Sequence, residues 1–416
     1  MTATTTSQPT VAILSTYPPT QCGLATFSRA LQAGLEQEGV TASIARIVST
    51  EEGAARAVPE VAQWPVVVTH TAGSDCARLL AALNSHDVVL VQHEFGIFAG
   101  ADGDEILRIL DAVERPVVTV LHTVLTAPTM HQRFIMQRLI TRSRALITMT
   151  QTGRRNLIKH YDVHPDRVEV IPHGAADVSR TDPQLLTHDS STVLTWGLLS
   201  EGKGIEWGIE ALALVQDQYP NLRYLVAGQT HPKVRLAEGE RYRFALMHRA
   251  RSLGVWDRVH LIDDYLDGEA LARIIRSAAI VLLPYDSKDQ VTSGVLTEAV
   301  VAGKPIIATR FPHAIELLAS GAGILVDQKD PAGVAEAISR LMDDPALARS
   351  MALQTHAIGE EFLWSTVSRR YAQLLAMATS PKVRSPLARA AESLSVLTSA
   401  SALSQRQATI MEATKR

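Results

Sequence analysis

The sequence predicts an α/β protein with two domains, each built on a parallel β-sheet. Short apolar runs alternate with longer amphipathic segments along most of the chain, which is typical of strands connected by helices. The alternation stops at a polar segment, residues 175–191, and then starts again, so we interpret this segment as a linker between domains. At 416 residues the chain is long enough for two or three domains.

The first half begins with a polar leader, residues 1–10, which we expect to be disordered, followed by an apolar run at 11–14. A loop containing Gly23 and a helical pattern over 26–38 come next, as in the first half of a βαβ unit. The GxGxxG fingerprint is absent, which argues against a nicotinamide or flavin cofactor. Further strands are expected at 66–68, 88–91, 117–121, 145–149 and 168–171, with helices at 75–83, 104–114, 130–141 and 152–161.

The second half shows the same alternation and contains one especially informative stretch, residues 281–309. This stretch predicts a buried strand, a polar loop, a helix that starts at Gly294, a stop at Gly303 and a second buried strand. Other strands are expected at 192–196, 222–227, 258–262 and 323–326. Helices are expected at 205–218, 241–253, 266–277, 313–320 and 331–342, with a polar loop at 229–240. Residues 364–377 form an amphipathic pattern, and the Ala- and Ser-rich tail after 380 fits either a surface helix or disorder.

Composition excludes several classes of protein. The net charge of −3 gives no support for a nucleic-acid partner held by charge. Cys22 and Cys76 are far apart and lie in no metal-ligand spacing, so we expect a reducing, cytoplasmic compartment. The first residues lack the pattern of a signal peptide, and no run of about 18 apolar residues predicts a membrane span. A peripheral membrane contact stays open, and the oligomeric state is not predicted.

Ligands of parallel α/β sheets bind outside the carboxyl ends of the strands, so polar residues just after strands are the candidates. On the N-terminal half these are His93 and Glu94, His122, and His173. For His122 and His93 the alternative is a histidine bonded only to a backbone carbonyl. The histidines show no motif such as HExxH, and we assign no metal.

On the C-terminal half, Lys203 lies between Gly202 and Gly204 where a strand meets a helix, a position suited to a diphosphate. A solvated surface lysine is the alternative. Glu298 is the ionisable residue of an otherwise apolar helix. Its carboxylate could bind ribose hydroxyls, or pair with a neighbouring cation. The start of that helix offers free N–H groups to an anion.

Five segments together resemble the retaining glycosyltransferases of family 4 (glycosyl transferase group 1), which have the GT-B fold of two facing Rossmann-like domains. The resemblance covers residues 11–378 and is carried by the Gly23 loop, His122, IPHG at 171–174, GLLSEGKG at 197–204 and SGVLTEAVVAGKPIIAT at 293–309. It implies an acceptor domain at 11–178 joined by a returning helix at 364–378. It also implies a donor domain at 190–363, followed by the tail at 380–416.

The resemblance also implies roles for individual residues. Lys203 matches the lysine that neutralises the donor diphosphate, and Glu298 matches the glutamate that holds the ribose. His122 matches the histidine near the transferred sugar. The donor contacts implied are Gly23, Gly197, Ser293, Gly294 and Val295, and the acceptor side is expected around His93 and Glu94.

Two positions depart from the family pattern. Leu198 replaces the usual arginine after the glycine, so Arg310 or another basic residue would have to substitute for that cation. Gln290 stands where the first glutamate of the pair is expected, eight positions before Glu298. A glutamine can bind sugar hydroxyls but cannot carry negative charge toward an oxocarbenium-like centre. Gln290 is therefore the catalytic position that the resemblance leaves most open.

The resemblance implies a metal-independent hexosyltransferase without a cofactor. It would use a nucleotide-diphosphate sugar and a carbohydrate, glycoside or lipid-linked acceptor, and would retain the anomeric configuration. The alternatives are a nucleotide-sugar epimerase, another GT-B enzyme, or a non-catalytic nucleotide-sugar-binding protein. Neither the sugar, the base nor the acceptor follows from the sequence.

Overall fold

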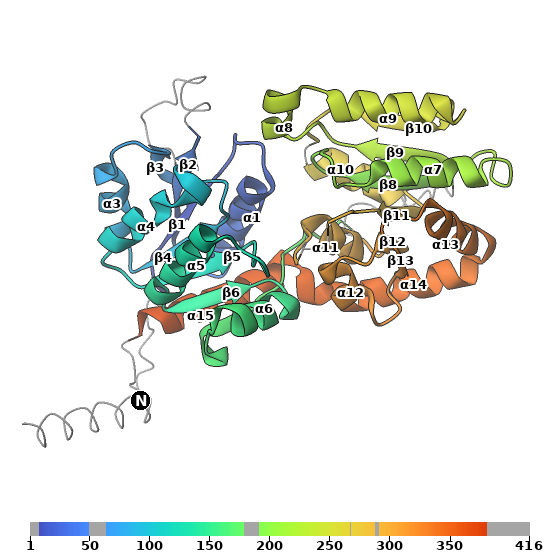
Figure 1. Cartoon of the computed structure of the whole chain (residues 1–416). Helices are drawn as coiled ribbons and strands as arrows, with labels where there is room; N and C mark the ends of the chain where they lie inside the picture. The colour runs from blue at the N-terminus through green and yellow to red at the C-terminus, as the bar shows by residue number, and fades with distance from the viewer. Residues whose placement is uncertain (1–7, 50–63, 179–190, 267, 288–290, 381–416) are drawn as a thin grey trace, which may run out of the picture. The chain divides into compact units, whose positions relative to one another are not determined.

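The structure is a computed structural model that describes residues 8–49, 64–178, 191–266, 268–287 and 291–380 (Figure 1). Residues up to Ala378 belong to one compact unit, and the chain from Thr379 is a second unit. Gln290, most of the expected leader and the tail after residue 380 lie outside the described residues.

The N-terminal half contains a seven-stranded sheet in the order β3-β2-β1-β4-β5-β6-β7, with every described pair parallel. Its strands are β1 Val11–Ser15, β2 Ala42–Val48, β3 Val66–Thr71, β4 Val88–His93, β5 Val117–Leu121, β6 Ala145–Thr148 and β7 Val168–Val170. The connecting helices are α1 Gly23–Gln37, α3 Ala77–Asn84, α4 Glu105–Ala112, α5 Met130–Arg142 and α6 Gln151–Tyr161.

The C-terminal half contains a six-stranded parallel sheet in the order β10-β9-β8-β11-β12-β13. Its strands are β8 Thr192–Trp196, β9 Arg223–Ala227, β10 Val259–Ile262, β11 Ile280–Leu283, β12 Ile306–Thr309 and β13 Ile324–Val326. Its helices are α7 Ile205–Val215, α8 Pro232–Glu238, α9 Arg241–Ser252, α10 Gly268–Ser277, α11 Gly294–Val301, α12 Pro312–Leu318, α13 Pro331–Asp343 and α14 Pro345–Gly359.

Both sheets have the strand order of a doubly wound fold, so each has a point where the order reverses. In the first sheet this point lies between β1 and β4, and in the second between β8 and β11. A crevice opens at the carboxyl ends of the strands at such a point, because the connections on either side leave in opposite directions. The fold thus places the loops after β4 and β11 where a ligand site is expected.

The last described helix, α15 Trp364–Thr379, packs on the N-terminal sheet (Figure 1). Val367, Tyr371 and Leu375 are buried in the same apolar cluster as Phe27 and Leu31 of α1. The axes approach closely at Gly34, where an added Cβ would overlap the Ser368 side chain. The amphipathic pattern at 364–377 therefore corresponds to a helix whose apolar face is buried.

Three elements were missed by the sequence analysis. β2 was overlooked because Ser43 and Arg46 break its apolar pattern, although both side chains are buried. The expected polar loop at 229–240 contains α8, which begins at Pro232. α14 was also missed; Asp344 caps it and Pro345 opens it. Polar residues can occupy buried strands when they find partners, as Arg46 does by donating to the Tyr17 carbonyl at 3.1 Å.

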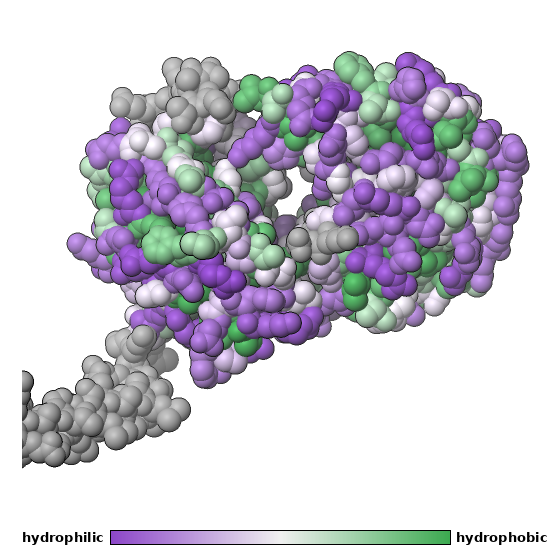
Figure 2. All heavy atoms as spheres, viewed as in Figure 1, coloured by the Kyte–Doolittle hydropathy of each residue, from purple (hydrophilic) through white to green (hydrophobic). Residues whose placement is uncertain are grey.

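The visible surface is mixed in polarity. On the face shown in Figure 2, apolar groups are interrupted by polar ones over both halves of the chain. None of the described helices combines the length and the hydropathy needed to cross a bilayer.

Candidate active site

A cleft of about 440 Å³ brings the strand-end residues of both halves together. From the N-terminal half and the linker it is lined by Glu94, His122, Thr123, Leu125 and His173. From the C-terminal half it is lined by Ser287, Val291, Thr292 and Gly294. The sequence analysis expected four of these residues at a ligand site, namely Glu94, His122, His173 and Gly294.

His122 is half-buried at the end of β5. Its Nε2 lies 2.7 Å from Oε1 of Gln92, and its ring meets the edge of Phe27 with centroids 5.0 Å apart. Burial, assisted by His173 and His93, lowers the pKa of His122 to about 3. The imidazole is therefore neutral at physiological pH and fixed by an amide side chain, so the backbone-carbonyl alternative is wrong for His122.

Glu94 faces the cleft directly after β4. Its Oε2 accepts a hydrogen bond from Thr123 Oγ1 at 2.5 Å, and its Oε1 accepts from the Phe95 amide at 3.1 Å. Burial raises the pKa of Glu94, although these hydrogen bonds act in the opposite direction. The carboxyl group is held in place by protein donors and has lone pairs left for a ligand hydroxyl.

His93 differs from its neighbour because its side chain is fully buried and is not among the residues that line the cleft. Its ring packs against Phe95 with centroids 5.0 Å apart, and neither ring nitrogen has a hydrogen-bond partner. Burial lowers its pKa to about 3. Of the pair expected on the acceptor side, Glu94 is thus the one exposed to a substrate.

A buried neutral histidine makes stability depend on pH, and His93 provides a test. The pKa of an unfolded histidine is about 6.5, so between that value and about 3 the unfolded chain binds a proton that folded His93 does not. Stability is therefore lost as the pH falls below about 7, by roughly 2 kcal/mol at pH 5. Urea unfolding at pH 7.5 and 5.0 should show a smaller loss for His93→Leu than for the wild type. His164→Leu, at an exposed position, should behave as the wild type, and equal losses in all three proteins would contradict this prediction.

On the opposite side, α11 begins with a well-defined cap. Ser293 Oγ accepts from the Leu296 amide at 3.2 Å, and the Ser293 amide donates to Nδ1 of His313 at 2.8 Å. No described group accepts from the amides of Gly294 and Val295, so these N–H groups and the positive end of the helix dipole are available to an anion. The expected anion site at this helix start is geometrically feasible.

Gly294 is needed for a close approach between the linker and α11. An added Cβ would lie 2.8 Å from Nε2 of His173. Nδ1 of His173 lies 2.7 Å from the Gly174 carbonyl, and burial lowers its pKa to about 4. His173 thus bonds to a backbone carbonyl through Nδ1, while its Nε2 faces the start of α11.

Lys203 lies in the loop between β8 and α7 and is half-buried. Its Nζ stands over the ring of Tyr285 at 4.5 Å from the centroid. The loop is held against the end of β11, because the Asp286 amide donates to the Gly202 carbonyl at 2.9 Å. Lys203 is therefore positioned by the loops at the switch point of the second sheet, unlike a solvated surface lysine.

Glu298 is half-buried on α11, and its Oε2 accepts from the indole Nε1 of Trp196 at 2.8 Å. Burial raises the pKa of Glu298, and the indole hydrogen bond acts to lower it. No described residue forms an ion pair with Glu298, so the cation-pair alternative is not supported by the described part of the chain. Trp196 was missed by sequence reasoning; its signal was an aromatic N–H donor at the end of a strand.

The remaining predicted donor residues occupy tight or exposed backbone. Gly197 has φ +115°, a backbone conformation that favours glycine, and an added Cβ would be in ordinary contact with Val295 Cγ2 at 3.5 Å. Gly23 is exposed at the start of α1, where Cys22 Sγ accepts from the Ala25 amide. Arg310, considered as a substitute for the cation absent at Leu198, pairs with Asp327 at 3.2 Å.

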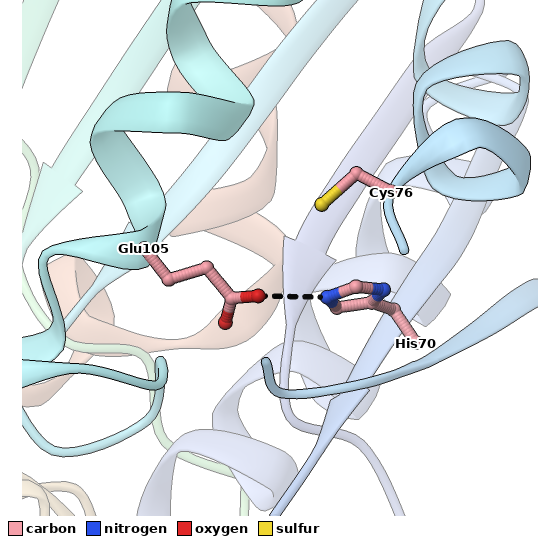
Figure 3. A group of neighbouring side chains, drawn as sticks. All are labelled: His70, Cys76 and Glu105. Atoms are coloured by element: carbon pink, nitrogen blue, oxygen red, sulfur yellow. Dashed lines mark hydrogen bonds and ion pairs between the residues drawn. The ribbon is translucent and has the colours of Figure 1, made fainter. Parts of the chain in front are cut away.

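One group of described residues combines metal-ligating side chains (Figure 3), and none of its three members is among the residues that line the cleft. The ligand atoms of His70, Cys76 and Glu105 lie within 4.8 Å of one another. Glu105 already accepts from His70 at 3.1 Å and from the Gly73 and Ala99 amides at 2.8 and 3.0 Å. Because protein donors satisfy this carboxylate, we interpret the group as a structural network that joins β3 to α4.

Two family models match the chain. The model described as Glycosyltransferase Family 4 matches residues 22–177, and that described as Glycosyl transferases group 1 matches residues 190–344. Each match contains the strand-end residues of one sheet that face the cleft on its side.

Curated relatives include two proteins named D-inositol 3-phosphate glycosyltransferase. The one from Corynebacterium glutamicum is 30% identical over 258 residues, which are 58% of this chain and 59% of that protein. The one from Acidothermus cellulolyticus is 31% identical over 233 residues, 53% of this chain and 50% of that protein. The chain thus spans between half and three-fifths of the length of these relatives.

Solved structures share the fold. HepE from Anabaena, crystallised with UDP, superposes with a TM-score of 0.70 at 16% identity, covering 88% of this chain and 100% of that chain. Sucrose-phosphate synthase from Thermosynechococcus elongatus gives a TM-score of 0.69 at 17% identity, covering 88% and 98%. The expected GT-B class of two Rossmann-like domains is confirmed.

Proposed function

This chain belongs to the group 1 glycosyltransferases of family 4, and on that premise we propose that it is a retaining hexosyltransferase. It transfers a hexose from a nucleoside-diphosphate sugar to an acceptor hydroxyl, and it uses neither a metal nor a cofactor. The observation that carries the proposal is the placement of these groups beside the switch point of the second sheet: Lys203 lies in the loop after β8, and Glu298 and the amides of Gly294 and Val295 belong to α11, which follows β11. These are groups suited to a diphosphate and a ribose.

For the donor we propose a UDP-sugar. HepE, which shares the fold, is crystallised with UDP and with UDP-glucose. In our proposal the diphosphate binds Lys203 and the amides of Gly294 and Val295. The ribose hydroxyls donate to Glu298, whose carboxylate is oriented by the Trp196 indole.

The proposed mechanism rests on electrostatic stabilisation of the leaving diphosphate. Negative charge grows on the diphosphate as the glycosidic bond breaks, and Lys203 together with the α11 dipole stabilises that charge without reorganising. The acceptor hydroxyl oxygen bonds to the anomeric carbon from the face on which the diphosphate leaves, and its proton passes to the departing diphosphate oxygen, which releases UDP and retains the configuration. His122 faces the transferred sugar as a neutral imidazole, so it can accept or donate a hydrogen bond without adding charge.

For the acceptor we propose a polyhydroxylated ring, free or as part of a glycoside or lipid-linked sugar, bound beside Glu94 and Thr123. The curated relatives are named for D-inositol 3-phosphate, a phosphorylated cyclitol, which supports a polyhydroxylated ring as the acceptor. We also infer a reducing, cytoplasmic compartment, supported by the two free thiols Cys22 and Cys76.

The function is tested by binding and turnover. Calorimetric titration with UDP, ADP and GDP should give the highest affinity for UDP, and UDP-glucose with an acceptor panel should release UDP in proportion to a glycosylated product. NMR of the product should show the anomeric configuration of the donor, and EDTA should leave the rate unchanged. UDP-sugar binding without any transfer would favour a binding protein, and conversion of the sugar without an acceptor would favour an epimerase.

The role of Glu298 can be separated from general damage by using 2′-deoxy-UDP. The wild type should bind UDP about tenfold more tightly than 2′-deoxy-UDP, because one charge-assisted hydrogen bond is lost with the hydroxyl. Glu298→Gln should weaken UDP binding and reduce that preference to about twofold. Asp217→Asn, at an exposed carboxylate, serves as the control. An unchanged preference in Glu298→Gln would contradict the ribose assignment.

A further inference from the structure

The side chain of Gln92 is fully buried near the carboxyl end of β4. In the register of β4 and β5, Gln92 lies opposite Val120, two positions before His122. Because side chains two positions apart in a strand point to the same face, the sheet brings Gln92 and His122 together. Oε1 of Gln92 lies 2.7 Å from Nε2 of His122. Gln92 is not among the residues that line the cleft, so its effect on a bound sugar would pass through His122.

The contact between Gln92 and His122 fixes which ring nitrogen carries the proton. An amide oxygen only accepts hydrogen bonds, so Nε2 of His122 has to be the N–H donor. Burial, assisted by His173 and His93, lowers the pKa of His122 to about 3, so the ring is neutral at physiological pH and has a single N–H. Nδ1 therefore keeps its lone pair, and any group that hydrogen-bonds to Nδ1 has to be the donor.

The orientation of the His122 ring is set by three contacts. The His122 amide donates to the His93 carbonyl at 3.1 Å, which joins this end of the backbone to β4. Phe27 meets the ring edge to face, with centroids 5.0 Å apart, and Phe27 is itself packed against His173 at 5.0 Å. These two contacts hold the plane of the ring, and the hydrogen bond to Gln92 distinguishes its two nitrogens. Without that bond the imidazole could turn over about χ2, which is a soft torsion.

A glutamine suits this position better than a carboxylate or an apolar side chain. An ionised carboxylate beside Nε2 would favour the imidazolium form, which has an N–H on both nitrogens and no acceptor. An apolar side chain would not orient the ring. Gln92 is also destabilising in one respect, because its own Nε2 is buried and has no hydrogen-bond partner among the described residues. A locally unfavourable group beside a ligand site is expected where the side chain serves function.

We propose that Gln92 is a positioning residue of the transferase, which holds His122 with its proton on Nε2 so that Nδ1 accepts a hydrogen bond from a hydroxyl of the transferred sugar. This inference rests on the proposed function and adds to it a residue and the direction of one hydrogen bond. A hydroxyl that donates to Nδ1 gains electron density on its oxygen. That density stabilises the positive charge that grows on the sugar as the glycosidic bond breaks.

NMR of the full-length protein, labelled with 15N in its histidines, tests the position of the proton without any substrate. The signals of His122 are identified by their loss in His122→Asn. We expect a pyrrole-type Nε2 with a resolved N–H proton and a pyridine-type Nδ1. Gln92→Met should lose the resolved N–H signal, because the proton no longer has an acceptor. A wild-type His122 that is protonated on Nδ1 overturns the inference.

Gln32→Met is a matched control, because it makes the same change at another buried glutamine. Gln32 lies on α1, and its Nε2 donates to the Ala42 carbonyl at 3.3 Å. This variant should leave the signals of His122 as they are in the wild type. Loss of the N–H signal in both variants would attribute it to general loosening of the domain and would count against the role of Gln92.

Kinetics with UDP-glucose test the consequence for transfer. Gln92→Met should lower kcat/KM by about fivefold to tenfold, the effect expected for one misaligned hydrogen bond. Its affinity for UDP should be unchanged, since UDP lacks the transferred sugar, and Gln32→Met should match the wild type in both measurements. Wild-type activity in Gln92→Met would contradict the inference.

The four monodeoxy analogues of UDP-glucose identify the hydroxyl that donates to Nδ1. In the wild type, removal of this hydroxyl should slow transfer. In Gln92→Met the same analogue should be used nearly as well as UDP-glucose, because the two changes remove one interaction and their effects do not add. If the losses add for every analogue, Nδ1 of His122 accepts from none of these hydroxyls and the inference is wrong.

Gln92→Glu keeps an acceptor oxygen at the same place and serves if Gln92→Met does not fold. At pH 8 it should retain the N–H signal and more activity than Gln92→Met. Its activity should fall on going to pH 6, where that of the wild type is steady, because the added carboxylate raises the pKa of His122 and the imidazolium has no acceptor. His93 and His173, the titratable groups that act on His122, are present in both proteins. Absence of the N–H signal from Gln92→Glu at pH 8 counts against the inference.

Failure of the proposed function would look different from failure of this inference. If the wild type neither binds UDP nor consumes any UDP-sugar, the transferase proposal is wrong, and the NMR experiment still decides whether Gln92 fixes the proton of His122. If the wild type transfers the hexose while His122 carries its proton on Nδ1, the transferase proposal stands and the role of Gln92 is wrong.

Discussion

Replacing Lys203 with alanine is expected to weaken UDP binding by roughly tenfold to hundredfold and to lower kcat/KM by about two to three orders of magnitude. A charge-assisted hydrogen bond to a phosphate contributes about 1.5–3 kcal/mol to binding. The larger effect on turnover follows because negative charge on the diphosphate increases in the transition state, where one preorganised donor contributes about 3–4 kcal/mol. UDP titration and initial rates with UDP-glucose measure the two effects.

The position of Lys203 makes this prediction specific. Its Nζ lies 4.5 Å from the centroid of Tyr285, so the ammonium group is held above the ring instead of moving freely in solvent. Lys203→Arg should recover only part of the loss, because a planar guanidinium cannot occupy the position of a compact ammonium. Lys159→Ala, at an exposed lysine on α6, should match the wild type. A Lys203→Ala protein with normal UDP affinity would remove this lysine from the donor site.

Replacing Gly204 with alanine is expected to lower the free energy of unfolding by about 3 kcal/mol or more and to weaken UDP binding. Gly204 has φ +64°, a left-handed conformation that costs an alanine about 1–2 kcal/mol. An added Cβ would also overlap the carbonyl oxygen of Pro284, the residue directly before Tyr285. To relieve this overlap, the loop that carries Lys203 has to move away from Pro284. Thermal unfolding should show a midpoint lower by roughly 4 °C or more, because the entropy of unfolding of a unit of this length is about 0.8 kcal/mol/K.

Gly202 provides a matched control for Gly204. It lies in the same loop with φ +87°, but an added Cβ would meet no atom within 4 Å. Gly202→Ala should therefore show only the conformational cost, about 1–2 kcal/mol, with a much smaller loss of UDP affinity. If the two variants behave alike, the close approach of Gly204 to Pro284 does not position the donor loop.

The sequence predicted most elements because their signals are local. Apolar runs at 11–14, 88–91 and 117–121 correspond to β1, β4 and β5, and the Gly303 stop follows α11. β2 was missed because its buried polar residues find their partners elsewhere in the chain, whereas α8 and α14 carry local start signals that were overlooked: a proline in the first turn and a capping side chain, His231 and Asp344. The buried Arg46 of β2, for example, is explained by the Tyr17 carbonyl, which is distant in sequence.

The residues around the site also divide into those that local sequence signals predicted and those that were missed. Lys203, Ser293 and Glu298 were found because a strand end, a helix start or an apolar helix distinguishes them locally. Trp196 and His313 were missed, since a tryptophan that binds Glu298 and a histidine that accepts from the Ser293 amide look like ordinary core residues in the sequence. Gln290 lies outside the described residues, and its role stays a prediction of the family resemblance.

By itself, the sequence determined the α/β class, the two sheets and the family, because alternation, glycine positions and short motifs depend on neighbouring residues. Only the tertiary structure decided which strand-end residues share a cleft. Glu94 faces the cleft whereas the adjacent His93 is buried, because successive residues at the end of a strand point in different directions. The tertiary structure also showed that the Glu298 carboxylate accepts a hydrogen bond from the Trp196 indole and has no ion-pair partner among the described residues, since hydrogen-bond partners distant in sequence meet only when the chain folds.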